Sequence, residues 1–383
     1  MANRHEAAHG TATRSTASRH EVQPVLSGRG PRGMWWVAWR QHRVQVMVAL
    51  VVMVVVAIGL LVFQLVLVGR LHAAGCTVLT DENQCNARLF PLVASAYDEG
   101  TWRILRAVLV ATPVVLGVFL GAPLFPREFD QRTEVLALTQ SVGRLRWWAT
   151  KIAVVGVPLV AGLLGLGFLT QWCDGTTWFT ARGAMDDGTF QVRSIMPAAF
   201  GLLALAIAVT AGVVVRSLVG SLVAGLIVAA GVVVLLAFPL RSHLLPTSRD
   251  ITPVDAVAAS PTAMPDPVGA YDPGSLYLAS GLLDANGDPI SFNAVSALCD
   301  PSMPPMPEGN PDQQEMDSYN DKYNKAFDEC RRDNGITRNY IDYVPASMLW
   351  PMRGVVTGIC VLLAALFLAA GAFRLRAAPR HSR

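Results

Sequence analysis

The chain has 383 residues, of which 52% are apolar and only 15% are charged. Soluble domains carry about 25% charged residues, so this composition excludes an ordinary soluble protein and indicates a membrane protein. The net charge of +3 carries little information by itself, and we expect no nucleic-acid partner.

Residues 1–32 are rich in Arg, His, Ser, Thr, Ala and Gly, and they contain too few apolar residues to form a core. We therefore expect a disordered cytoplasmic tail. The stretch from His5 to His9 matches the H-E-x-x-H pattern of zinc proteases. That chemistry needs a rigid helix, a third ligand and a closed cleft, which a free terminus does not offer. We interpret the match as coincidence and expect no metal site.

An aromatic and basic stretch, Met34 to Arg43, precedes the first apolar run. We expect an interfacial helix here, with tryptophan rings at headgroup depth and guanidinium groups toward the lipid phosphates. The expected anchors are Trp35, Trp36 and Trp39. A plain aromatic belt without a mechanical role explains the same residues equally well.

Six apolar runs have about the length that crosses a bilayer as a helix, roughly 20 residues each. They are Val44–Val68, Ala107–Leu124, Ile152–Leu169, Ile195–Val215, Leu218–Leu240 and Val355–Phe373. We therefore predict an all-α polytopic membrane protein with six transmembrane helices. The expected divisions are a transmembrane domain over 33–240 with spans one to five, an extracytoplasmic loop domain over 241–350, a sixth span over 351–376 and a cytoplasmic tail over 377–383.

Arginine and lysine are concentrated on one side of these spans. They occur in the N-terminal tail, in the loop between spans two and three, at Arg216 in the short connection between spans four and five, and in the C-terminal tail. The opposite loops are acidic on balance, notably between Asp300 and Asp333. Because cytoplasmic loops carry the excess of basic residues, we predict a multi-pass plasma membrane protein with both termini in the cytoplasm.

Cysteines fall in pairs on the other side. Cys76 and Cys85 share the first outer loop, and Cys299 and Cys330 share the largest one. Two pairs within single loops on the oxidising side favour disulfides, with free thiols as the alternative. In the same large loop, we expect mostly loop over Thr247–Gly274, a turn after the apolar stretch Ser275–Leu283, and a charged helix over Asp312–Asn334 that ends at Gly335.

A charged segment, Pro126 to Lys151, lies between spans two and three. Its first half predicts a short amphipathic helix at the membrane surface. The polar face of that helix holds Arg127, Glu128, Asp130 and Glu134, and its apolar face includes Phe129. A basic and aromatic collar follows, where the next helix enters the lipid, formed by Arg144, Arg146, Trp147 and Trp148.

The string R-E-F-D-x-x-T-x-x-x-A-x-T-Q-S-V-x-R-x-R-W-x-x-x-K in this segment resembles the first cytoplasmic loop of ABC-2-type transporter permeases, particularly the actinobacterial branch. The stretch from Tyr340 to Pro351 resembles the same group, which carries a similar Tyr-x-Pro-Ala-Ser…Trp signature before its last span. The resemblance implies a coupling helix that docks on a separate ABC ATPase subunit, through the charged residues named above and Phe129 as an apolar plug. It also implies export of a substrate, and a homodimer or a related permease as the second half, surrounded by membrane lipid.

The chain lacks the G-x-x-x-x-G-K-[ST] motif that cradles ATP phosphates, so we expect ATP and Mg on the partner subunit, no cofactor on this chain and no catalytic residues. The spans hold almost no ionisable residues, which proton- or sodium-coupled carriers use as relays. Two alternatives stay open. One is a membrane-anchored extracytoplasmic sensor or binding protein formed by 241–350, and the other is an ATP-independent carrier or channel.

Overall fold

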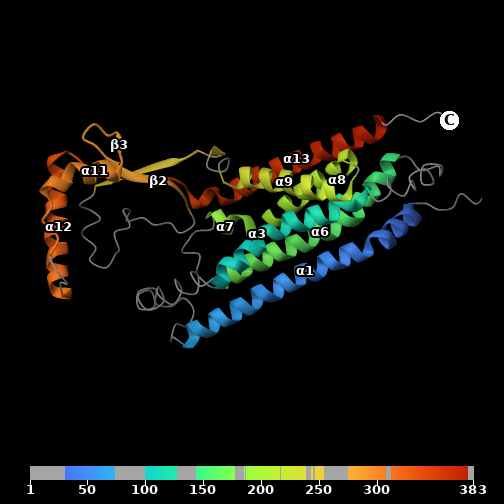
Figure 1. The fold of residues 1–383 in the computed structure, drawn as a ribbon, viewed down its shortest axis with the longest axis horizontal. Coiled ribbons are helices and arrows are strands. Elements are labelled where there is room, and N and C mark those ends of the chain that lie inside the picture. The colour runs from blue at the N-terminus through green and yellow to red at the C-terminus, as the bar shows by residue number, and fades with distance from the viewer. Residues whose placement is uncertain are drawn as a thin grey trace, which may run out of the picture.

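The computed structural model describes residues 31–73, 100–126, 144–176, 185, 187–215, 217–238, 243–244, 246–253, 275–307 and 312–377. Within these ranges, six helices are long and apolar enough to cross a membrane, which confirms the six predicted spans. They are α1 (Pro31–Ala73), α3 (Gly100–Gly121), α6 (Arg144–Thr176), α8 (Met196–Val215), α9 (Leu218–Ala237) and α13 (Leu349–Ala377). Figure 1 shows them as one elongated bundle, with a smaller domain at the end away from the C-terminus.

Helix α8 is the centre of the bundle. It contacts α3, α6, α9 and α13, and most of its side chains are buried. The approach of α3 is especially close, because α3 carries glycines at 117 and 121. A Cβ at Gly117 would lie 2.7 Å from the carbonyl oxygen of Gly201 and 2.8 Å from the Cβ of Ala204. Helices α3 and α8 therefore pack backbone against backbone, as small residues at four-residue spacing allow.

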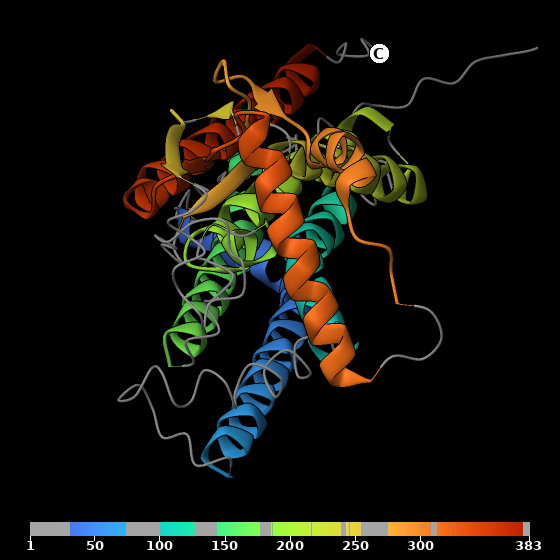
Figure 2. The same cartoon turned by 90° about the vertical axis from the view of Figure 1, so that its left-hand side faces the viewer.

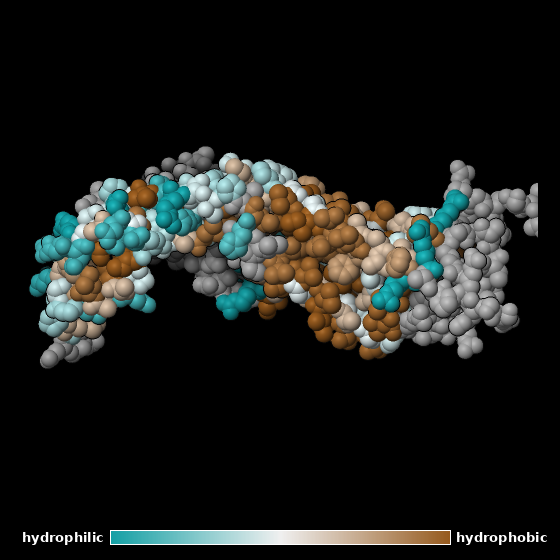
Figure 3. All heavy atoms as spheres, turned by 90° about the horizontal axis from the view of Figure 1, so that it is seen from above, coloured by the Kyte–Doolittle hydropathy of each residue, from teal (hydrophilic) through white to brown (hydrophobic). Residues whose placement is uncertain are grey.

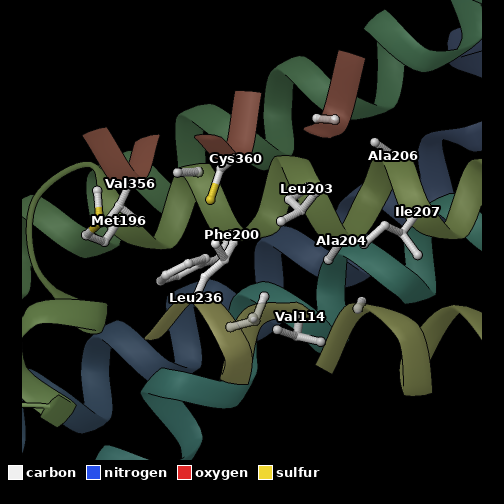
Figure 4. Close-up of a cluster of buried hydrophobic side chains, with 14 of the residues drawn as sticks. Val114, Met196, Phe200, Leu203, Ala204, Ala206, Ile207, Leu236, Val356 and Cys360 are labelled. Carbon is white, nitrogen blue, oxygen red and sulfur yellow. The ribbon is translucent and has the colours of Figure 1, made fainter. Parts of the chain in front are cut away.

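Two apolar clusters share α8 as a common wall. One joins α8 to α3, α9 and α13, and Figure 4 shows its members Phe200 and Leu203 with Leu236 and Cys360. The other joins α8 to α1, α3 and α6. Because interiors are close-packed, a displacement of α3 or α6 must be accommodated by α8.

The outer surface of the bundle is apolar. Many valine, leucine and isoleucine side chains of α1, α9 and α13 are exposed. On the face seen in Figure 3, hydrophobic residues form a belt over the bundle, and the surface of the smaller domain is mostly hydrophilic. Such a belt is the surface that lipid tails cover in a membrane.

The stretch Met34–Arg43 is not a separate interfacial helix, because α1 runs without a break from Pro31 to Ala73. Pro31 suits the first helical turn, and no glycine or proline interrupts the chain between Arg40 and Val44. A helix of 43 residues is about 65 Å long, roughly twice the thickness of the hydrocarbon layer. The basic and aromatic turns are thus an extension of the first span.

A four-stranded antiparallel sheet lies in the smaller domain, which we call the sheet domain (residues 243–348). Its order is β1-β4-β2-β3, with β1 at Ser248–Pro253, β4 at Arg338–Val344, β2 at Leu276–Leu283 and β3 at Pro289–Ile290. The all-α prediction is therefore wrong for this domain, and so is the expected loop at the start of 247–274. β1 is an edge strand paired only with β4 among the described strands, and a proline ends it, which suits an edge.

Two helices complete the sheet domain, α11 (Phe292–Cys299) and α12 (Gln313–Asp333), and Figure 2 shows α12 lying across the end of the molecule. α12 confirms the predicted charged helix. Asp312 caps it by accepting a hydrogen bond from the backbone N–H of Glu315 at 2.8 Å, and Gly335 follows it with φ +72°. A disulfide joins Cys299 to Cys330, as predicted for this pair. The other expected pair, Cys76 and Cys85, lies outside the described residues.

Candidate coupling site

The segment 127–143 lies outside the described residues, and with it the predicted contacts Arg127, Glu128, Phe129, Asp130 and Glu134. The structure describes the two ends between which this segment runs. One end is the short helix η1 (Ala122–Leu124) with Phe125 and Pro126, directly after α3. The other end is the first turns of α6.

The two ends are joined to each other through side chains. Phe125 is fully buried, and its ring meets that of Trp147 edge to face with centroids 5.6 Å apart. The Nζ atom of Lys151 lies 4.3 Å from the centroid of Trp147 and 5.9 Å from that of Phe125. We call these three residues the aromatic clasp. An aromatic pair contributes about 0.5–1.5 kcal/mol beyond burial, and a cation–π contact up to about 2 kcal/mol when desolvated.

The clasp is made from residues that the local sequence places on one face. Trp147 and Lys151 are four residues apart on α6, so their side chains are neighbours on the helix surface. Lys151 is only 3% exposed, and the aromatic rings cover its ammonium group at the point where α6 enters the bundle. A buried charge held against two rings fixes the orientation of this turn of α6.

The end of α3 also rests on the junction between α8 and α9. A Cβ on Gly212 would lie 3.0 Å from the carbonyl oxygen of Ala122 and 3.3 Å from Cδ of Pro126. On α9, the hydroxyl of Ser221 donates to the carbonyl of Leu218 at 2.9 Å and lies 3.5 Å from that of Ala122. The point from which the segment 127–143 departs is therefore seated on two further spans.

Trp148 extends the site to the last span. It is buried, and its ring lies 3.8 Å from the position that a Cβ on Gly371 of α13 would occupy. Nearby, the hydroxyl of Thr210 donates to the carbonyl of Phe367 at 2.7 Å and ties α8 to α13. The two adjacent tryptophans thus contact different elements. Trp147 belongs to the aromatic clasp, and Trp148 packs against α13.

The remaining predicted anchors lie on the surface. Trp35 and Trp36 are exposed, Trp39 is half-buried, and the guanidinium of Arg40 lies 5.4 Å from the ring of Trp36. Arg146 is exposed. The side chain of Arg144, the first residue of α6, lies outside the described part of the structure. Their role at the lipid headgroups stays a prediction.

Sequence reasoning missed Phe125 and the seat formed by Gly212 and Ser221. In the sequence, Phe125 is simply the end of an apolar run, and its partner lies beyond the whole charged segment. The W-W-x-x-K spacing at 147–151 was the available signal, because it places an aromatic ring and a cation on one helix face.

The arrangement suits a mechanical role. No group of three His, Cys, Asp or Glu side chains that could hold a metal occurs within the described ranges. The site instead connects the ends of one loop to each other, to the α8–α9 junction and to α13. A displacement of the loop would therefore reach several spans at once.

A family model described as "ABC-2 membrane transporter related" matches residues 45–241, slightly more than half of the chain. The matched region begins in α1 and ends just after α9, so it contains the aromatic clasp and the segment between its two ends. Neither the curated proteins nor the solved structures contain a match to this chain.

Proposed function

The chain belongs to the ABC-2 membrane transporter related family, and we propose that it couples ATP hydrolysis on a separate subunit to the export of a substrate across the plasma membrane. Family membership and the six long apolar helices make it a multi-pass plasma membrane protein and the permease component of an ABC transporter. Such a component is not itself catalytic, and the ATPase activity lies on a partner subunit.

The aromatic clasp is the observation that carries the proposal. In this mechanism, residues 127–134 dock on the ATPase subunit, with Arg127, Glu128, Asp130 and Glu134 as charged contacts and Phe129 as an apolar plug. ATP and Mg are held by that subunit. When ATP closes it, the docked residues move. Because Phe125 and Trp147 join the two loop ends, α3 and α6 move together against α8.

The proposed orientation places the segment 126–151 and both termini in the cytoplasm and the sheet domain outside. The Cys299–Cys330 disulfide supports it, because disulfides persist on the oxidising side of the membrane. Figure 1 supports it as well, since the sheet domain and the C-terminus lie at opposite ends of the bundle. A second permease chain, identical or related, completes the translocation path.

The contact between the sheet domain and the bundle favours the permease over a tethered sensor. Leu276 of β2 and Val344 of β4 belong to the same buried apolar cluster as Met352 and Val356 of α13. The sheet domain is therefore packed onto the spans, as a part of the transporter would be.

Co-purification from native membranes tests the proposal. We expect tagged wild-type protein in mild detergent to carry an ABC ATPase, and Glu128→Arg to lose it through charge reversal at the docking surface. Glu329→Arg is the matched control, because Glu329 is exposed on α12 in the sheet domain. An ATPase retained by both variants would remove Glu128 from the contact. A wild-type preparation that keeps other membrane complexes but carries no ATPase would overturn the proposed coupling.

A further inference from the structure

Two arginines flank a short helix at the other end of the bundle, and a third lies near one of them. The helix is α7 (Asp187–Val192), between α6 and α8. The guanidinium of Arg106, on α3, occupies the place that a Cβ on Gly188 would take. Arg193 follows α7, and its positive charge acts on Arg353 of α13. Arg193 and Arg353 are both buried, at 6% and 2% exposure. We call these three residues the arginine cluster.

The cluster lies where the spans meet the sheet domain. Met196 and Val356 belong to one buried cluster and lie side by side in Figure 4. Arg353 precedes Val356 by three positions on α13 and therefore lies about one turn nearer to the sheet domain. Arg193 lies in the bend that leads into α8 just before Met196. Arg353 lies four residues after Leu349, the first residue of α13, which is roughly 6 Å along the helix axis. This distance from the start of the span corresponds to the level of the lipid headgroups.

Three buried donors around the cluster have no hydrogen-bond acceptor among the described residues. They are Nε of Arg353, Nε2 of Gln191 and the hydroxyl of Ser194. All three residues are more than nine-tenths buried. Buried polar groups are normally paired, and a buried guanidinium donor without an acceptor is especially unfavourable. An anion bound here would provide the missing acceptors.

The backbone holds these donors in place. Ser194 adopts φ +57°, a left-handed conformation that is uncommon outside glycine, and its N–H donates to the carbonyl of Gly167 at 2.9 Å. Gly167 is needed there because the carbonyl of Ser194 occupies the place of a Cβ. The ring centroid of Trp350 lies 5.1 Å from the guanidinium carbon of Arg353, and this contact orients the guanidinium.

We propose that Gln191, Ser194 and Arg353, with Arg193 beside them, bind a phosphate group at this end of the bundle. Arginine suits phosphate because its planar guanidinium donates several parallel hydrogen bonds and stays charged. The phosphate belongs either to a lipid headgroup or to a free anion. This site is separate from the coupling segment, and its existence does not depend on the ATPase partner.

Ligand-dependent thermal unfolding of the full-length protein in non-ionic detergent tests the site. The probes are 1-oleoyl lysophosphatidate, monooleoylglycerol with the same chain and no phosphate, and inorganic phosphate. We expect lysophosphatidate to raise the unfolding temperature of the wild type and monooleoylglycerol to leave it unchanged. Stabilisation by inorganic phosphate at comparable concentrations would identify a free anion as the ligand, and stabilisation by lysophosphatidate alone would identify a lipid headgroup.

Variants connect the effect to the proposed residues. Arg353→Met loses a charge-assisted donor, and we expect roughly 10- to 100-fold weaker binding. Arg374→Met is the matched control, since Arg374 is exposed near the far end of α13. Gln191→Met removes a neutral donor and tests the site if Arg353→Met does not fold, with weakening of roughly 3- to 10-fold expected. The proposal would be overturned if Arg353→Met and Gln191→Met responded to the phosphate probe as strongly as the wild type does. Equal stabilisation by the two lipids, or no response to any phosphate probe, would also overturn it.

Discussion

The ring of Phe125 meets the ring of Trp147 edge to face, with centroids 5.6 Å apart, although the whole charged segment lies between them in the sequence. This contact joins the two described ends between which the segment runs. Lys151 strengthens the contact by placing its ammonium group against both rings. Force applied to the loop would thus reach α3 and α6 together.

We expect Trp147→Leu to weaken coupling without abolishing assembly with the ATPase. Leucine keeps apolar volume but loses the edge-to-face pair and the cation–π contact, together roughly 1–3 kcal/mol. The measurement is substrate-stimulated ATP hydrolysis by the reconstituted complex, which should fall several-fold. Trp172→Leu, at an exposed site near the other end of α6, should behave as the wild type. Equal stimulation in both variants would contradict the role of the clasp.

Gly117→Ala should destabilise the bundle. The new Cβ would meet the carbonyl of Gly201 at 2.7 Å and the backbone nitrogen of Leu205 at 2.9 Å, so α3 and α8 must separate. Overpacking of this kind costs about 1–3 kcal/mol and should lower the unfolding temperature by several degrees. Gly165→Ala is the matched control within a span, because nothing lies within 4 Å of its added Cβ. If the two variants unfold at the same temperature, the close α3–α8 contact is wrong.

Removal of the Cys299–Cys330 disulfide should destabilise the sheet domain. The bond closes a loop with a sequence separation of 31, for which chain entropy gives about 3–4 kcal/mol. We expect the double variant Cys299→Ser/Cys330→Ser to unfold in lower denaturant than the wild type. Reductant should reproduce the shift in the wild type and add nothing in the double variant. A further shift in the double variant would show that another disulfide matters.

The pairing of Arg249 with Asp342 should make the sheet domain sensitive to acid. Arg249 donates to both carboxylate oxygens, at 2.7 and 2.8 Å, and these hydrogen bonds lower the pKa of Asp342. Because the pKa of Asp342 is lower in the folded than in the unfolded protein, the ion pair stabilises the fold at pH values above the unfolded pKa, about 4. This stabilisation is lost as the pH falls through the folded pKa. Asp342→Asn should therefore unfold at a lower temperature than the wild type at pH 7, and the difference should disappear in acid. Since both groups are largely solvated, the effect is small.

Arg249→Gln supplies the control for this pair. It should produce the same loss at pH 7, and combining it with Asp342→Asn should add nothing. A difference between Asp342→Asn and the wild type that persists unchanged at low pH would show that the ion pair is not its cause.

The spans could be predicted from sequence because each depends only on a local run of apolar residues. The fourth span was expected at Ile195–Val215, and α8 occupies Met196–Val215. The cap at Asp312 and the glycine at 335 are equally local, which is why α12 was recognised. The sheet was not recognised, because β1 is short and its residues alternate only weakly between polar and apolar. β1 is a strand because it pairs with β4, a contact that the local sequence does not reveal.

The functional contacts were harder to foresee for the same reason. Phe125 follows η1 whereas Trp147 lies on α6, and Arg193 lies between α7 and α8 whereas Arg353 lies on α13. Periodicity places a helical residue on a face of its own helix but does not say which residue of another element it meets. The continuity of α1 was also missed, since a change from basic to apolar residues suggests a boundary where the backbone has no reason to break.

The most direct test of the coupling mechanism places a photo-crosslinking amino acid at position 129, in place of the proposed apolar plug. Illumination of native membranes should join this chain to an ABC ATPase subunit. The same probe at Phe292, an exposed residue of α11 in the sheet domain, should give no such product. Crosslinks to the ATPase from position 129 alone are the result that our account predicts. Crosslinks to the ATPase from Phe292 and none from position 129 would contradict our account. They would mean that the ATPase binds on the side of the sheet domain and that the proposed orientation of the bundle is inverted.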